Sequence, residues 1–345
     1  MFRFAKTYIP QVRAHVDKEL DKMRVECVTK YKESRIATAL WNMPQDGRDV
    51  TEIMDRIKTN AQYSRRFYTD GGNITGAVYN NDEDHWSFIA DVMRETIVSN
   101  PLHIDEFLYV TQMEAEIIRW TINLYNGDEN VCGIVTSGGT ESIILAMLAY
   151  REQALQERGV TKPNMVMSET AHCAFDKGGF YYGIEIRKVP ITKDFMCDVA
   201  AMKRNIDKNT IALVASAPEY AFGNYEPVAE ICELAKPYGI GVHVDCCLGS
   251  YVNPFIKKLG YKLAYEHDFK IKGVTSMSCD PHKYAYGPKG TSICMFRSKR
   301  LREYQFFCNT SWNGGLYATT CIAGSRPGCT IAATWASMLK HGVKG

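Results

Sequence analysis

The chain has 345 residues, of which 46% are hydrophobic and 23% charged, with a formal net charge of +2. This composition is typical of a globular protein and excludes a disordered chain, and the small, scattered charge gives no reason to expect nucleic acid as a partner. The twelve cysteines are irregularly spaced and include no C-x-x-C pair, which favours free thiols in a reducing compartment over zinc ligands or disulfides.

The first hundred residues are polar, charged and irregular in pattern. Residues 1–20 form a modestly basic, amphipathic start without the apolar core and cleavage site of a signal peptide. A docking helix is the commoner role of such a segment, and peripheral contact with a membrane surface is the other. No run of about 18 apolar residues occurs, so we expect no membrane-spanning helix. Residues 68–86 are rich in Gly, Asn and Asp, which predicts a long loop.

Regular structure is predicted from residue 112 onward. Apolar residues share one face of a predicted helix over 112–125, namely Met113, Ile117, Ile118 and Ile122. A short strand over 131–137 and a helix over 138–159 follow. Further strands are predicted in 164–169, 184–191, 210–217, 240–245, 271–278 and 291–296, with helices near 172–180, 198–206 and 227–236. This alternation predicts an α/β fold with a largely parallel sheet.

The stretch TSGGTES, residues 136–142, lies where the first strand is followed by a helix. Its glycines allow a close backbone approach to an anion, the amides of the helix start point toward such a ligand, and Thr140 adds a hydroxyl. The other interpretation is a tight turn with a helix cap, for which Ser137 or Thr140 is suited. This stretch alone supports the phosphate site and the structural turn about equally.

Two further residues lie at predicted strand ends. Asp245 ends the strand over 240–245, where open α/β sheets bind ligands, but it is equally suited to cap the next helix. Lys283 follows the strand over 271–278 and lies among tyrosines. An amine beside apolar and aromatic walls can become a nucleophile toward a carbonyl, although a single lysine in a turn is more often solvated.

Taken together, these residues predict a pyridoxal phosphate site. That cofactor needs a lysine for its Schiff base, an acid for its pyridinium nitrogen and an anion site for its phosphate. His172 adds a flat ring suited to stacking on the cofactor, with a packed core histidine as the alternative.

Five stretches, in this order, resemble the sphingosine-1-phosphate lyase family, a branch of the fold-type I pyridoxal phosphate enzymes near the group II decarboxylases: TSGGTES, TAHCAFDKG, VHVDCCLGS, SCDPHKYAYGPKG and GGLYATTCIAGSRPG. The resemblance runs from about residue 60 to the last residue. It implies a large domain with a mostly parallel seven-stranded sheet flanked by helices. It also implies an N-terminal segment with substrate and dimer loops (1–105), a cofactor-binding large domain (106–325) and the start of a linker helix (326–345) to a C-terminal small domain that this chain lacks.

The resemblance implies a role for each cofactor residue. Lys283 carries the cofactor, Asp245 pairs with its ring nitrogen, His172 stacks on one ring face and Cys247 packs near the other. The phosphate is contacted by Gly139, Thr140 and His282. Pro281 stands where relatives have a hydroxyl residue, which removes one further phosphate contact.

Substrate residues are implied in the same way. Tyr79 and His103 match positions that reach the partner subunit's site and help to hold the substrate phosphate, so a homodimer with shared active sites is implied. Lys289 matches a second lysine that is important in the family, and Tyr317 a tyrosine near the substrate. The catalytic base stays open among Tyr317, Lys289 and the substrate phosphate.

The implied activity is that of a carbon–carbon lyase of sphingolipid metabolism. It cleaves sphingosine 1-phosphate, a phosphorylated long-chain base, by a retro-aldol reaction to phosphoethanolamine and a long-chain aldehyde. A pyridoxal-phosphate amino-acid decarboxylase is the nearest alternative, and a truncated, non-catalytic homologue that serves as a scaffold is the other. The implied location is the cytoplasm or the cytosolic face of the endoplasmic reticulum.

Overall fold

A computed structural model describes residues 10–33, 40, 42–65, 76–263 and 265–345, and the chain divides into two units, residues 1–81 and 82–345. The first unit contains α2 (Pro10–Glu33) and α3 (Val50–Arg65). The helix over 10–20 agrees with the docking helix expected at the start of the chain, of which residues 1–9 lie outside the described residues. The expected irregular pattern is wrong for the rest of α2 and for α3. They are rich in Lys, Glu, Arg and Met, all strong helix formers, and no glycine interrupts them.

The second unit begins with α4 (Glu83–Thr96). Asp82 caps this helix by accepting a hydrogen bond from the Asp84 backbone N–H, and acidic residues in the first turn suit the positive end of the helix dipole. The predicted loop over 68–86 is therefore wrong at its end, since 83–86 are helical. Residues 76–82 carry no regular structure, and 68–75 lie outside the described residues.

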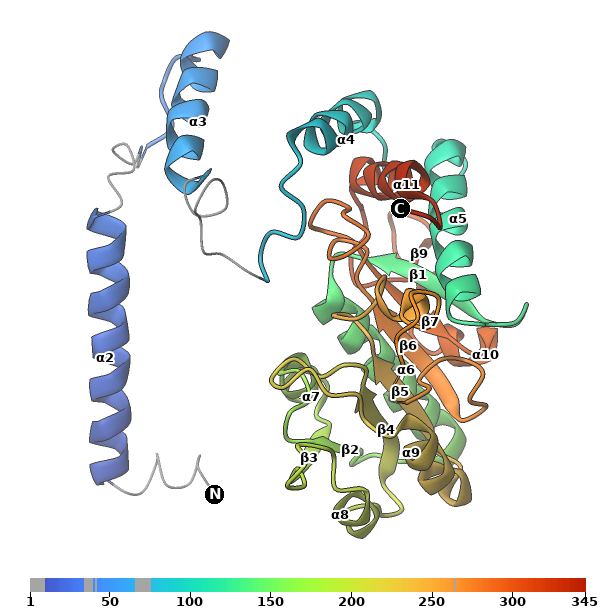
Figure 1. Ribbon diagram of the computed structural model, residues 1–345. Helices are drawn as coiled ribbons and strands as arrows, with labels where there is room; N and C mark the ends of the chain where they lie inside the picture. The colour runs from blue at the N-terminus through green and yellow to red at the C-terminus, as the bar shows by residue number, and fades with distance from the viewer. Residues whose placement is uncertain (1–9, 34–39, 41, 66–75, 264) are drawn as a thin grey trace. The chain divides into compact units, whose positions relative to one another are not determined.

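Among the described residues, seven strands form one sheet in the order β1-β7-β6-β5-β4-β2-β3 (Figure 1). Their bounds are β1 (Cys132–Thr136), β2 (Asn164–Ser168), β3 (Glu185–Val189), β4 (Thr210–Ser216), β5 (Gly241–Asp245), β6 (Val274–Cys279) and β7 (Ser292–Phe296). Only β7 runs antiparallel to its neighbours β1 and β6. The predicted mostly parallel seven-stranded sheet is confirmed, and the connection over 280–291, which carries Lys283, contains no helix.

Helices cover both faces of the sheet. One core packs beneath α6 (Gly139–Arg158), α7 (Ala174–Tyr182) and α10 (Lys299–Glu303). The other packs beneath α5 (Leu108–Leu124), α8 (Val199–Arg204), α9 (Val228–Ala235) and α11 (Gly328–His341). Successive side chains of a strand point to opposite faces of the sheet, so each strand contributes to both cores. In β4, Ala212 and Val214 face the first core, whereas Leu213 faces the second. Because both faces are covered, the central strands read as continuous apolar runs.

The buried face of α5 differs in part from the prediction. Ile117 and Ile122 are buried, but Met113 and Ile118 are only partly buried. The buried face includes Glu114 because its carboxylate forms a bidentate ion pair with Arg326, at 2.6 and 2.9 Å, between α5 and the segment that precedes α11.

The C-terminal part of the second unit packs closely. α11 lies against both α4 and α5 (Figure 1). Before it, β8 (Phe307–Asn309) and β9 (Tyr317–Thr319) form a separate antiparallel pair, and short 3-10 turns occur at Lys236–Tyr238 and Asn253–Phe255. The twelve cysteines lie within the described ranges and all are free. In that part of the chain we find no helix with the length and apolarity needed to span a membrane. The division at 105 and 325 stays a prediction.

Candidate functional site

Lys283 lies in a tight turn directly after β6. Its backbone N–H donates to the Asp280 carbonyl at 3.0 Å, which closes the turn. The same three-residue spacing brings the two side chains together, with Nζ of Lys283 2.9 Å from Oδ2 of Asp280. The Asp280 carboxylate is buried, and its Oδ1 has no hydrogen-bond partner in the structure. The lysine amine is thus held at the end of the strand by a buried anion.

Asp245 is the last residue of β5, and the sheet register places it level with Ser216 of β4 and Ser278 of β6. The Asp245 side chain is buried, and its Oδ1 accepts hydrogen bonds from the Cys247 N–H (3.1 Å) and the Ser278 hydroxyl (3.3 Å). Among the described residues, no donor reaches Oδ2. This carboxylate therefore keeps one oxygen for a further partner.

A small cavity of about 30 Å³ lies at these strand ends, and both Lys283 and Asp245 line it. The two functional groups therefore face the same space, rather than opposite sides of the sheet. The lining residues are His172, Ser216, Pro218, Glu219, Tyr220, Asp245, Cys247, Leu248 and Lys283.

His172 and Cys247 are the other predicted site residues in this cavity. His172 precedes α7 and is exposed; its Nδ1 accepts the Ala174 N–H at 3.1 Å, so the proton of the neutral ring is on Nε2. Burial, together with the nearby Asp245 and Asp280 carboxylates, raises the pKa of the Cys247 thiol well above its ordinary value. Cys247 therefore stays a neutral thiol and serves as a packing group.

The start of α6 lies beside the lysine turn. Gly138 is the N-cap residue, and the Ser137 N–H donates to the Glu141 carboxylate at 2.7 Å, so neither Ser137 nor Thr140 acts as the predicted cap. A Cβ on Gly139 would lie 2.9 Å from Oδ2 of Asp280 and 3.0 Å from the Cys247 sulfur. A glycine is needed at this position because the helix start approaches the cavity wall closely.

A chain of hydroxyl groups joins the helix start to the lysine turn. Thr136 of β1 contacts Ser142 of α6 at 2.7 Å, and Ser142 contacts Ser292 of β7 at 2.8 Å. Ser292 then donates to the Cys279 carbonyl at the end of β6, at 3.0 Å. The hydroxyls are buried, so these bonds are shielded from water.

His282 and Lys289 flank Lys283 in the same connection. The Nδ1 of His282 donates to the Thr291 carbonyl, and its Nε2 lies 3.8 Å from the Asp280 carboxylate. The Lys289 amine donates to the His282 carbonyl at 3.2 Å. Burial and the positive charge of Lys283 lower the pKa of Lys289. The connection over 280–291 therefore concentrates basic groups beside one buried carboxylate.

The remaining predicted residues do not line this cavity. Thr140 is half-buried in the first turn of α6, His103 is exposed between α4 and α5, and Tyr317 begins β9. The Tyr317 ring makes edge contacts with Trp312 and Phe307. Tyr79 belongs to the first unit, where its hydroxyl donates to the Gly76 carbonyl at 2.9 Å. Their roles stay predictions.

Three residues of the site are missing from the sequence-based prediction. Asp280 was detectable, because it stands three residues before Lys283 and the turn residue Pro281 lies between them. Ser216 ends its strand level with Asp245. Glu226 adjoins the cavity residue Ser216, whose N–H it accepts at 2.7 Å, and its second oxygen is buried with no hydrogen-bond partner among the described residues. Burial, with the Glu219 and Asp245 charges, raises the pKa of Glu226 to about 7.

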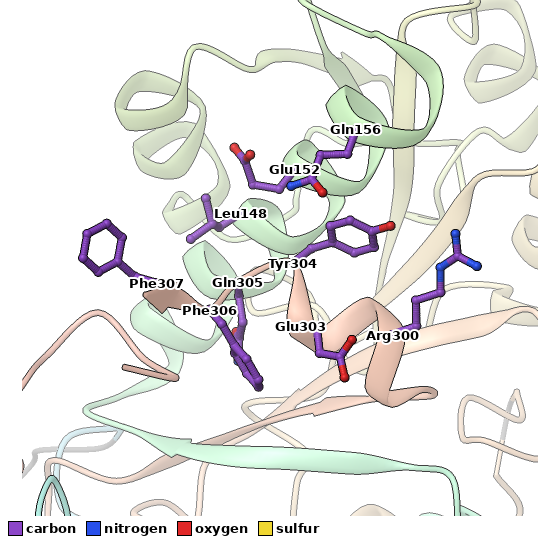
Figure 2. A pocket seen from close by; sticks show the side chains of 9 residues that line it. All are labelled: Leu148, Glu152, Gln156, Arg300, Glu303, Tyr304, Gln305, Phe306 and Phe307. Atoms are coloured by element: carbon purple, nitrogen blue, oxygen red, sulfur yellow. The ribbon is translucent and has the colours of Figure 1, made fainter. Parts of the chain in front are cut away.

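A larger cavity, of about 670 Å³, lies elsewhere in the second unit (Figure 2). Its lining comes from α6, α10 and the residues up to β8, and contains none of the predicted site residues: Leu148, Glu152, Gln156, Arg300, Glu303, Tyr304, Gln305, Phe306 and Phe307. Charged groups pair with one another at its rim, where Arg300 and the Tyr304 hydroxyl both contact Glu157 at 2.7 Å.

Comparison with known proteins gives concordant results. Residues 39–345 match the family model described as the pyridoxal-dependent decarboxylase conserved domain. A sphingosine-1-phosphate lyase of Drosophila melanogaster is 41% identical over 346 residues, covering 100% of this chain and 63% of the fly protein. Sphingosine-1-phosphate lyase 1 of Rattus norvegicus is 45% identical over 303 residues, covering 88% of this chain and 53% of the rat protein. The chain thus spans about half to two thirds of the length of these curated relatives.

Solved structures point the same way. The sphingosine-1-phosphate lyase of Burkholderia pseudomallei superposes with a TM-score of 0.86 at 34% identity, covering 89% of this chain and 72% of that one. A glutamate decarboxylase of Lactobacillus brevis, at 21% identity and a TM-score of 0.72, shares the fold, with 91% of this chain and 72% of that one covered. This chain shares with both of them the architecture of the fold-type I pyridoxal phosphate enzymes. Within that class, the chain belongs to the pyridoxal-dependent decarboxylase family, in its sphingosine-1-phosphate lyase branch.

Proposed function

We propose that this chain cleaves a phosphorylated long-chain base, with sphingosine 1-phosphate as the first candidate, to phosphoethanolamine and a long-chain fatty aldehyde. The observation that carries the proposal is the single cavity that Lys283, Asp245 and His172 line together. The lyases of Drosophila melanogaster, Rattus norvegicus and Burkholderia pseudomallei support the choice of substrate.

The side chains around the cavity fit pyridoxal phosphate by their chemistry. A primary amine and a carboxylate with one unengaged oxygen face one space, and the closely approaching Gly139 opens a long helix whose amides suit a phosphate. Asp280 supplies a second buried anion.

When bound, the cofactor supplies an acceptor for the electron pair of the bond that is broken at the substrate's Cα. Lys283 would hold the cofactor covalently through Nζ, and the Asp245 carboxylate would keep a proton on its ring nitrogen. His172 would stack on one face of the ring, and the neutral Cys247 thiol would pack near the other. Phosphate contacts are assigned to Gly139, Thr140 and His282.

Cationic and phenolic side chains of the protein are proposed to contact the substrate. Burial and the nearby Lys283 charge lower the pKa of Lys289, which makes it suited to exchanging a proton with a substrate oxygen. Tyr317 is the other candidate for that proton transfer, with the substrate phosphate as the third. Tyr79 and His103 are assigned to the substrate phosphate in the partner subunit of a homodimer, whose two active sites are shared. The proposed location is the cytoplasm or the cytosolic face of the endoplasmic reticulum, with peripheral membrane contact.

The test reconstitutes the purified chain with pyridoxal phosphate. We expect a visible absorption band of bound cofactor and aldehyde release from sphingosine 1-phosphate. Lys283→Ala removes the only amine in the cavity lining, so it should abolish both. Lys236→Ala is the matched control, because that lysine pairs with Glu233 on the surface of the second unit and should leave both unchanged.

The same preparation separates the alternatives. Carbon dioxide release from amino acids, without aldehyde release from sphingosine 1-phosphate, would identify a decarboxylase. A folded chain that takes up no cofactor at all would refute the enzyme assignment in favour of a scaffold.

A further inference from the structure

Behind the lysine turn, a histidine is buried without its full set of hydrogen bonds. His85 of α4 is completely buried, and its Nε2 lies 2.9 Å from the Tyr286 carbonyl oxygen. A carbonyl only accepts, so Nε2 carries the proton and donates. Nδ1 is then a buried acceptor, and it has no partner in the structure. Burying a nitrogen without a partner is unfavourable, and an apolar side chain at this position would avoid that cost. The hydrogen bond to Tyr286 is what a histidine provides here and an apolar side chain would not.

The acceptor of that bond belongs to a strained residue. Tyr286 has a φ of +56°, a conformation that a bulky residue rarely adopts without outside support. The Tyr286 N–H donates back to the Lys283 carbonyl at 3.2 Å, and the Gly287 N–H donates to Pro281 at 3.2 Å. The strained residue thus closes the turn that begins at the lysine.

Two helices hold this turn from outside. α11 adds a hydrogen bond from the Ser337 hydroxyl to the Ala285 carbonyl at 2.7 Å. The Tyr286 ring makes edge contacts with His85 of α4 (6.4 Å between ring centroids) and His341 of α11 (5.3 Å). Burial lowers the pKa of His85, and the neighbouring His341 and Lys340 act in the same direction, so the ring stays a neutral donor.

We propose that His85 is a positioning residue for Lys283: its Nε2–H holds the Tyr286 carbonyl, keeps the turn over 283–287 in its strained conformation and so fixes where the lysine amine points. The assignment of Lys283 as the cofactor-bearing residue rests on the function proposed above. The hydrogen-bonded turn itself does not depend on it.

The test compares two substitutions of His85. His85→Gln is the matched control, because its side-chain amide can place an N–H near the position of Nε2. His85→Leu fills the space without a donor. In the cofactor-free protein, amide hydrogen exchange at Tyr286 and Gly287 should rise at least tenfold in the Leu variant and much less in the Gln variant, while exchange in α6 stays unchanged. If the Leu variant does not fold, His85→Asn, whose shorter amide cannot span the distance, takes its place.

With pyridoxal phosphate bound, the donorless variant should also shift the pH titration of the cofactor's absorption band and lower kcat more than it raises KM. Unchanged exchange at Tyr286 and Gly287 in the Leu variant would overturn the proposal, as would equal increases in the Gln and Leu variants. A wild-type chain that takes up no cofactor would instead overturn the proposed function, and the exchange measurement would still decide the role of His85.

Discussion

The two cavities of the second unit differ in a way that volume alone does not reveal. The larger one, about 670 Å³, has the exposed Arg300 in its lining (Figure 2). Arg300 forms its ion pair with Glu157, which lies outside the lining. The smaller one, about 30 Å³, contains the buried Asp245 and the half-buried Lys283, each held by the strand ends and turns around it. Burying charges is unfavourable, so their concentration at the smaller cavity is the stronger sign of function.

The largest effect should come from breaking the ion pair between Lys283, which lines the smaller cavity, and the buried Asp280. Asp280→Asn removes the negative charge that Lys283 contacts at 2.9 Å, and breaking such a pair from one side should lower the unfolding free energy of the cofactor-free protein by roughly 3 kcal/mol. Urea unfolding measures this loss. Lys283→Met and the double variant complete a double-mutant cycle, and strictly additive effects would show that the two side chains do not stabilise each other.

The next effect depends on pH. The pKa of Glu226 is raised to about 7, so between about pH 4.5 and 7 the folded protein keeps a proton that the unfolded chain releases. The contribution of this group to stability is therefore present below that range and is lost as the pH rises through it, by up to roughly 3 kcal/mol. Glu226→Gln should remove this dependence and be the more stable form at pH 8. Parallel unfolding curves of the two proteins from pH 5 to 8 would contradict the assignment.

A smaller effect on stability is expected at the start of α6. Gly139→Ala would place a Cβ within 3.0 Å of the Asp280 carboxylate and the Cys247 sulfur, and crowding of this kind costs about 1 kcal/mol. Cofactor affinity, measured by equilibrium titration of the absorption band, should fall at least about tenfold because the added methyl group narrows the site. Gly159→Ala, at the other end of α6, is the control for cofactor affinity. Because Gly159 has a φ of +64°, this change should also lower stability but should leave the affinity unchanged.

The smallest effect is expected at the larger cavity. Arg300 is highly exposed, and its pair with Glu157 is open to solvent and salt. Arg300→Ala should therefore leave the urea midpoint and aldehyde release unchanged within error. A clear loss of aldehyde release in Arg300→Ala would show that the larger cavity has a role in the reaction. It would then be wrong to assign function to the smaller cavity alone.

Much of the fold follows from the apolar pattern, because strands buried on both faces produce short apolar runs separated by helices. The helix α3 and the second half of α2 escaped prediction, although the apolar residues of α3, namely Val50, Ile53, Met54 and Ile57, have helical spacing. The helix cap at Gly138 also escaped, because the hydroxyls of TSGGTES suggested Ser137 or Thr140, whereas Glu141 satisfies the Ser137 amide.

Site residues could be predicted where their position along the sequence identifies them. They could not be predicted where their place in the site depends on which strands are neighbours in the sheet. Lys283 and Asp245 stand out because each comes directly after an apolar strand. The positions of Ser216 and Glu226 depend on which strands are neighbours and how they are aligned, and sequence spacing does not contain that information. His85 was missed for a similar reason, because its partner Tyr286 lies 201 residues away.

The hydroxyl chain from Thr136 through Ser142 and Ser292 to the Cys279 carbonyl has a mechanical consequence. It joins the end of β1 and the start of α6 to the end of β6, which precedes the lysine turn, so we expect these two walls of the smaller cavity to keep their relative positions. A ligand bound by the amides of α6 would therefore be held in a fixed position relative to the lysine turn.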